Sequence, residues 1–325
     1  ALIIGTLASV LLSKFAGIDF ATIGSKFPEL ANGLPMPKPV APTFDYETIK
    51  GLVSPAFTIA ILCAIESLLA RVYLYKQQYD SAEICATNVI NSGNYRLATA
   101  NEYADPSDSY YGFWNEASWT NVGEVVFGAY NGASEGSTII GNVTHPDEYG
   151  DVRVSEDLLK LFEEDDIRYE MLRTSSVHSG YYWPNKYQGK EGEMALASIP
   201  MIRISELYLI RAEAYCNLGN FGSATADVVA LRKARGVSGS ISVNEDNWLD
   251  VIDDERVREL YMEGFRLNDL KRWGRGFERT PQSNIQAEGS KLKVEAGNPR
   301  FVWPIPKHEI EAPGSEIIGN ASNNL

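Results

Sequence analysis

Two segments of this chain repeat one helix–turn–helix pattern, and that repeat constrains the fold more than any other feature. Residues 68–91 and residues 204–235 each read as two amphipathic helices joined by a short turn. Tyr79 and Phe221 hold matching positions in the two copies. Small residues also recur at matching positions: Ala70, Ala82, Ala212 and Ala224. Small residues let two helices approach closely, so the pattern predicts tetratricopeptide-like packing, with the two aromatic rings filling the gap.

Two repeats alone do not make a stable array, so other helices must complete the layer. Residues 250–273 predict one long helix with an apolar face and a stripe of charged residues opposite, which we interpret as solvated or structural ion pairs. Residues 154–166 predict another helix, with Ser155 as its N-cap. Residues 124–130 alternate like a short strand. The expected fold class is therefore all-α, with tetratricopeptide-like repeats, long irregular loops and minor β structure, preceded by an apolar helical segment.

Composition and charge exclude several classes of function. The net charge is -14 and no cluster of Lys and Arg is present, so we expect no nucleic-acid partner. The chain has no P-loop, dinucleotide-binding or metalloprotease motif. The acids at 163–166 read as a solvated helix end rather than one half of a glycosidase carboxylate pair. We therefore expect no catalytic residues, no metal and no cofactor.

The three cysteines are predicted to be core residues. Cys63, Cys85 and Cys216 are far apart in the sequence and form no CxxC pair, which argues against a zinc site or a redox-active dithiol. Cysteine is among the residue types most often buried, so a small apolar role fits all three.

Residues 1–69 differ in character from residues 70–325, and we place a domain boundary between them. An apolar start and the 19 residues at 52–70 flank a Pro-rich stretch. The second apolar run approaches the ~20 residues that span a bilayer. No basic segment precedes the apolar start and the first cysteine is Cys63, so we expect neither a signal peptide nor a lipid-anchor cysteine here.

Three stretches of the first part resemble the SulP anion-transporter family. They are GTLASVLL, FATIGSKFPELANGLPMPKP and SPAFTIAILCAIESLL. The resemblance implies membrane segments in which Glu66 matches an intramembrane glutamate. It covers about 69 residues and joins the helical repeats with no polar linker. A natural fusion usually has such a linker, so we interpret the junction as chimeric, from a misassembled reading frame or an engineered fusion.

The second part resembles the SusD/RagB family in several segments that occur in the family's order. The most specific is IPMIRISELYLIRAEAYCNLGNFGSATADVVALRKARG, followed by DDERVRELYMEGFRLNDLKRWG and the closing NPRFVWPIPKHEI. LLARVYLYKQQYDSAEICATNVINSGNYRL, GEVVFGAY and SEDLLKLFEEDDIRYEML match earlier parts. The resemblance covers about residues 70–325.

The SusD/RagB resemblance implies a non-catalytic lipoprotein on the outer face of the outer membrane. Such a protein binds an oligo- or polysaccharide and caps a TonB-dependent, SusC-like barrel that imports it. Two alternatives from other classes remain open. One is a tetratricopeptide-like scaffold for protein interactions, and the other is a remnant of a SulP-type anion transporter.

Two aromatic loop clusters have the make-up of a sugar-binding surface. Sugars offer apolar C–H faces and a rim of hydroxyls, which aromatic rings and neighbouring amides can match. The clusters lie in DSYYGFWNEASW and HSGYYWPNKY, among Gly and Ser. The candidate ligand-binding residues are Tyr110, Tyr111, Trp114, Asn115, Trp119, Tyr181, Tyr182, Trp183 and Asn185. Trp248, Trp273 and Trp303 are instead expected in the core.

Overall fold

The computed structural model describes residues 46–104, 114, 123–132, 139–189, 193–282 and 291–324. The chain divides into two compact units, residues 1–54 and residues 55–325. Helix α3 spans Tyr46–Tyr75. The domain boundary predicted between residues 69 and 70 stays a prediction.

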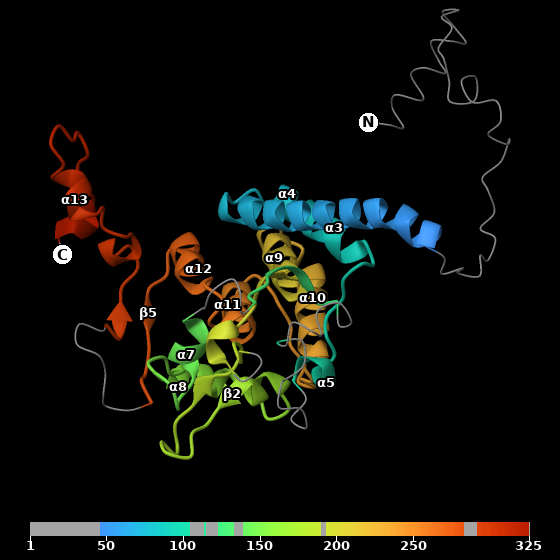
Figure 1. Cartoon of the computed structure of the whole chain (residues 1–325), viewed down its shortest axis with the longest axis horizontal. Coiled ribbons are helices and arrows are strands. Elements are labelled where there is room, and N and C mark those ends of the chain that lie inside the picture. Colours follow the sequence, from blue (N-terminus) through green and yellow to red (C-terminus); the bar gives the residue numbers. More distant parts are fainter. Residues whose placement is uncertain are drawn as a thin grey trace, which may run out of the picture. The chain divides into compact units, whose positions relative to one another are not determined.

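The core of the second unit is built from packed helices (Figure 1). Helix α3 turns into α4 (Tyr79–Asn91), and α9 (Ile204–Asn217) turns into α10 (Phe221–Ala234). Both predicted helix–turn–helix segments are confirmed. Helix α9 packs against α4 on one side and α10 on another, so it is buried along nearly all of its length.

The small residues of the repeat allow this close packing. Ala70, Ala82, Ala212 and Ala224 are fully buried. Tyr79 packs against the cluster that joins α3, α4 and α9, and Phe221 packs against the cluster that joins α9, α10 and α11. The repeated pattern thus places each aromatic ring at a helix–helix contact, as the sequence predicts.

The predicted single helix over residues 250–273 is wrong, because the chain breaks there into two helices. Helix α11 (Trp248–Leu260) packs on α9, and α12 (Arg266–Trp273) follows after a five-residue turn. Met262 and Gly264 have φ values of 64° and 83°, which no α-helix accommodates. The apolar face continued across the break, so periodicity alone could not reveal it.

Short strands and turns connect the helices. Strand β1 (Val125–Ala129), which confirms the predicted strand, pairs antiparallel with β4 (Ile199–Arg203). The pairs β2 (Leu172–Arg173) with β3 (Trp183–Pro184) and β5 (Phe277–Glu278) with β6 (Lys293–Val294) are also antiparallel. The remaining elements are α5 (Ala100–Tyr103), α7 (Ile140–Thr144), α8 (Glu156–Leu161), η3 (Ile167–Met171), η4 (Met194–Leu196), η5 (Pro299–Phe301), α13 (Lys307–Ile310) and η6 (Ala321–Asn324). The predicted all-α class with minor β structure is confirmed.

Helix α8 begins as the sequence predicts. The Ser155 hydroxyl accepts a hydrogen bond from the Leu158 amide at 3.2 Å, so Ser155 caps the helix N-terminus. The helix ends at Leu161 rather than continuing to residue 166. Cys63, Cys85 and Cys216 are all buried and unbridged, which confirms their expected place in the core.

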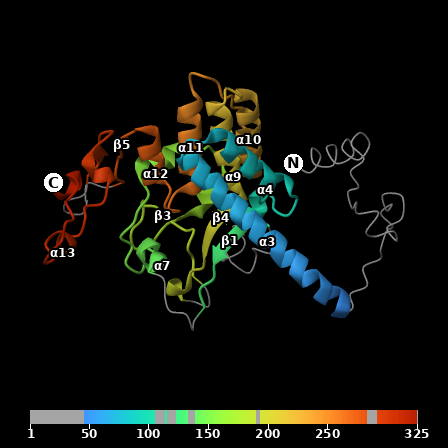
Figure 2. The ribbon, with the colours of Figure 1, turned by 90° about the horizontal axis from the view of Figure 1, so that it is seen from above.

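One side of α3 packs into the core and the other remains apolar and exposed. Ala70 and Leu74 are fully buried beside Ile204 and Leu207 of α9. The exposed side carries Ile61, Leu62, Ile65, Leu68 and Val72. Figure 2 shows the length of α3 as the blue helix that crosses the bundle. By length and composition alone, Thr58–Tyr75 is the one stretch of helix within the described residues that could cross a membrane.

We predict that Ala224→Leu destabilises the protein far more than Ala226→Leu, two residues along the same helix. Ala224 is fully buried, so added carbon atoms must displace its neighbours at a cost of about 1–3 kcal/mol. Ala226 is exposed, and its substitution should stay within about 0.5 kcal/mol. Urea unfolding of both variants measures the difference, and equal losses would contradict the packing described for α10.

Candidate functional site

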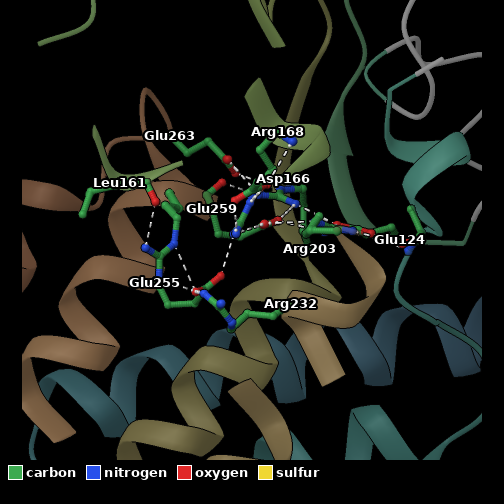
Figure 3. Close-up of polar contacts among 12 residues, drawn as sticks. Glu124, Leu161, Asp166, Arg168, Arg203, Arg232, Glu255, Glu259 and Glu263 are labelled. Atoms are coloured by element: carbon green, nitrogen blue, oxygen red, sulfur yellow. Dashed lines mark hydrogen bonds and ion pairs between the residues drawn. The ribbon is translucent and has the colours of Figure 1, made fainter. Parts of the chain in front are cut away.

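A buried network of ion pairs lies where α10, α11 and β4 meet the loops (Figure 3). Its centre is Glu259 of α11, which accepts hydrogen bonds from Arg203 at 2.8 Å and from Arg235 at 2.8 and 3.0 Å. Arg203 and Arg235 also both contact Glu124, at 2.7 and 2.6 Å. All four side chains are essentially inaccessible to water.

The network extends to the turn before η3. The Arg168 guanidinium donates bidentate hydrogen bonds to the Asp166 carboxylate at 2.7 and 2.8 Å. It also forms a salt bridge with Glu255 of α11 at 2.6 Å. Glu255 in turn accepts a hydrogen bond from Arg258 at 2.7 Å. Asp166 is therefore buried and paired, so the prediction that all four acids at 163–166 form a solvated helix end is wrong for this residue.

The arginines keep the central carboxylates ionised. Burial alone would raise the pKa of Glu259, but the positive charges of Arg235 and Arg203 outweigh it and hold this pKa well below its ordinary value. The pKa of Glu255 is lowered in the same way, chiefly by Arg168 against the effect of burial. The stripe of charged residues predicted within residues 250–273 thus forms structural ion pairs. Of the two predicted roles, solvated or structural ion pairs, the structure has the second.

Lys186 links the network to the second aromatic cluster. Its ammonium group donates hydrogen bonds to the Glu259 carbonyl and to Glu263, both at 2.7 Å. It also lies 3.9 Å from the ring centroid of Tyr261 and 4.9 Å from that of Trp114. Burial lowers the pKa of Lys186 to about 8, although Glu263 opposes the shift.

Further hydrogen bonds fix the loop that carries this cluster. The Tyr187 hydroxyl donates a hydrogen bond to the Met262 carbonyl at 3.0 Å, and the backbone N–H of Asn185 donates one to the Met171 carbonyl at 2.9 Å. The Trp183 indole N–H donates to the Gly150 carbonyl at 3.0 Å. The loop is therefore anchored to the turn after α11, to η3 and to the turn before residue 151.

Three of the predicted ligand-binding residues lie in the interior. Trp183 is 1% exposed, Trp114 is 5% exposed and Asn185 is buried beside Arg173, which donates to its side-chain oxygen. These side chains support the surface above them. Trp114 contacts Tyr187 edge-on, with ring centroids 6.5 Å apart, so the structure brings a residue of the first aromatic cluster against the second.

The partly exposed members of the second cluster form a small surface with neighbours that sequence reasoning missed. The Arg153 guanidinium lies 4.5 Å from the Tyr181 ring centroid and 5.1 Å from that of Trp183. Tyr182 packs against Tyr169, with centroids 5.8 Å apart, and the hydrogen bond between these two side chains raises the pKa of Tyr169 to about 12. We call Arg153, Tyr169, His178, Tyr181 and Tyr182 the aromatic surface.

The other predicted site residues are Tyr110, Tyr111, Asn115 and Trp119, which lie outside the described residues. Arg153 and Tyr169 could not be predicted as site residues from the sequence, because each lies in a stretch of ordinary composition. The expectation of a core Trp303 is wrong, since this ring is 83% exposed, whereas Trp248 and Trp273 do pack against a core cluster.

Comparison with known proteins supports the resemblance found in the sequence. Residues 168–315 match the SusD family. The chain is 42% identical over 77 residues to the starch-binding protein SusD of Bacteroides thetaiotaomicron, which is 23% of this chain and 13% of SusD. Both matches agree with the SusD/RagB resemblance that the helical segments predict.

Solved structures share the fold. A SusD superfamily protein of Bacteroides thetaiotaomicron is 28% identical with a TM-score of 0.63, over 77% of this chain and 58% of that one. A SusD-like carbohydrate-binding protein of Bacteroides vulgatus is 22% identical with a TM-score of 0.61, over 76% and 57%. The chain thus spans little more than half the length of these solved relatives.

We predict that Glu259→Gln strongly destabilises the protein, because it removes one of the two carboxylates that the buried Arg203 and Arg235 share. Removing one member of a buried ion pair costs about 3–5 kcal/mol. Asp254→Asn on the exposed side of the same helix is the matched control and should change stability by less than about 0.5 kcal/mol. Chemical denaturation measures both, and equal stabilities would show that the network contributes little.

The lowered pKa of Lys186 predicts a specific pH dependence. Between pH 8 and the ordinary value of 10.5, the unfolded chain holds a proton on this lysine that the folded chain has released. The wild type should therefore gain stability relative to Lys186→Met as the pH rises through this range, by at most about 1.4 kcal/mol per pH unit. Unfolding at pH 7.5, 8.5 and 9.5 tests this, with exposed Lys160→Met as control; a difference that is flat or falls with pH would contradict it.

Proposed function

We propose that this chain is a non-catalytic glycan-binding component of an outer-membrane uptake system. The match of residues 168–315 to the SusD family supports the class of protein, and the name of one relative gives starch as what that protein binds. The observation that carries the proposal for this chain is the aromatic surface, where Tyr181, Tyr182 and Tyr169 are partly accessible over a rigid support.

The chemistry of this surface suits a sugar. A ring face of Tyr181 or Tyr182 can stack on the apolar C–H face of a pyranose, while the Arg153 guanidinium and His178 offer hydrogen-bond donors to its hydroxyls. Because buried Trp183 and Lys186 fix the loop, little conformational entropy is lost when a ligand binds. The rings of Trp114 and Trp183 then serve as the base of the site rather than as stacking partners.

The proposal includes the cellular setting that the family resemblance implies. The protein would lie at the cell surface, anchored to the outer membrane as a lipoprotein, and pass its glycan to a SusC-like TonB-dependent barrel. A scaffold for protein interactions is the second candidate, because the exposed apolar side of α3 offers a surface that sugars do not need. A SulP-type remnant fits less well, since the other side of α3 packs into the helical core.

We predict that the chain is retarded in affinity gels containing a polysaccharide, with starch, xylan, pectin and mucin as the panel. Tyr181→Ala should weaken binding about twofold to tenfold, because one aromatic stacking contact contributes roughly 0.5–1.5 kcal/mol. Tyr130→Ala, an exposed tyrosine beside β1, is the matched control and should bind as the wild type does.

Two outcomes would contradict the glycan proposal. One is mobility that no polysaccharide in the panel changes. The other is retardation that Tyr130→Ala reduces and Tyr181→Ala does not, which would place binding elsewhere. Capture of the chain by a SusC-like barrel in the absence of any sugar response would favour the scaffold.

A further inference from the structure

A second candidate binding site lies on the C-terminal segment, in residues that do not belong to the aromatic surface. It is a hollow of about 320 Å³, at the lower end of the range that small ligands occupy. Two side chains of different character line it: the indole of Trp303, which is 83% exposed, and the guanidinium of Arg300. A wide aromatic face and a cation in one hollow can bind a ligand by stacking and by charge together.

The backbone that carries Trp303 is held in place on both sides. Phe301 is buried in a core cluster, which anchors the segment just before the exposed ring. The Ser322 hydroxyl donates a hydrogen bond to the Val302 carbonyl at 2.5 Å, and the Asn320 side-chain amide donates one to the Trp303 carbonyl at 2.8 Å. Because these contacts position the ring before a ligand arrives, little entropy is lost when a ligand stacks on it.

The Arg300 guanidinium is available to a ligand. Its backbone N–H donates a hydrogen bond to the Asn298 side chain at 2.9 Å, which fixes the start of η5. Among the arginines that the structure describes, Arg300 is the only one whose side chain forms no ion pair, hydrogen bond or aromatic contact. The chain has 43 acidic residues for 29 basic ones, so an arginine that none of these acids neutralises is unusual here.

The two groups together narrow the class of ligand. A guanidinium binds a carboxylate through two parallel hydrogen bonds, which are stronger than hydrogen bonds to a neutral hydroxyl. Nucleic acid requires several basic groups along its phosphates, and the hollow has one. An acidic peptide supplies a carboxylate but no flat C–H face for the indole. A sugar that carries a carboxylate supplies both features on one ring.

We propose that Arg300 and Trp303 bind an acidic glycan, whose sugar units carry a carboxylate. The inference rests on the proposed glycan-binding function and adds to it a second contact and a class of sugar. The apolar face of the pyranose stacks on the Trp303 indole, and its carboxylate accepts two hydrogen bonds from the Arg300 guanidinium. A neutral sugar can make the first contact but not the second.

Titration calorimetry of the full chain with tetragalacturonate and with its methyl ester, the same sugar without the charge, tests the proposal. The wild type should bind the acid about twofold to fivefold more tightly than the ester, and Arg300→Gln should bind both equally. Trp303→Ala should weaken both ligands about twofold to tenfold, because stacking does not depend on the charge. Both side chains are exposed, so both variants should fold.

Arg96→Gln is the matched control, because it removes the same charge from an exposed arginine in another part of the chain. It should keep the wild-type preference for the acid. The proposal is overturned if the wild type shows no preference, if Arg300→Gln and Arg96→Gln reduce the preference equally, or if Trp303→Ala changes neither affinity. Oligoglutamate that binds as tightly as tetragalacturonate, with the same dependence on Arg300 and Trp303, would also overturn it in favour of acidic peptides.

Failure of this inference is distinguishable from failure of the proposed function. If starch or another polysaccharide still retards the chain and Tyr181→Ala weakens that binding, the glycan-binding function stands and only the site at Arg300 and Trp303 is wrong. If no polysaccharide and neither galacturonate ligand binds, both proposals are overturned.

Discussion

The carboxylate of Glu259 is the point on which the structure depends, because it pairs with arginines from two different elements in a region that solvent does not reach. Arg203 ends strand β4, and Arg235 ends helix α10. A buried charge costs several kcal/mol unless a counter-charge and hydrogen bonds compensate it. Both arginines also contact Glu124, so their burial requires α11 to bring Glu259, and the residue before β1 to bring Glu124, to the same place. This requirement couples the positions of these elements.

The network also explains why an irregular loop can serve as a binding surface. Loops normally gain mobility from their lack of regular hydrogen bonding. Here Lys186 ties the loop to Glu259 and Glu263, and Tyr187 ties it to the turn after α11. The partly exposed rings of Tyr181 and Tyr182 consequently rest on a support that belongs to the helical core.

Much of the helical architecture could be predicted because it follows from local pattern. The alanines at 70, 82, 212 and 224 and the periodic apolar residues around them specify the helix pairs. The break after Leu260 could not be predicted, because the apolar spacing continues through it and only the backbone at Met262 reveals it. Family resemblance supplied the class of protein, which helical periodicity alone does not.

The candidate site was harder to predict than the fold. The composition of residues 178–187 pointed to a sugar-binding surface, but composition cannot tell which rings face water. Trp183 and Asn185 are buried because Gly150 and Arg173, distant in the sequence, reach them. Trp303 shows the opposite case. It lies in an apolar segment that predicted a core position, but its ring is exposed. Some of the buried ion pairs likewise join partners that are distant in the sequence, 56 residues for Arg203 with Glu259 and 87 residues for Arg168 with Glu255.

Native-state amide hydrogen exchange tests most directly whether the loop of the aromatic surface belongs to the core. The backbone amide of Asn185 donates to the Met171 carbonyl, and amides of α9 report global unfolding. If the ion network joins the loop and the helices into one cooperative unit, the opening free energy at the Asn185 amide should equal that of the α9 amides. Both free energies should then decrease together as denaturant is added. Exchange at Asn185 several kcal/mol easier than in α9, and insensitive to denaturant, would show a loop that opens alone and would contradict this account.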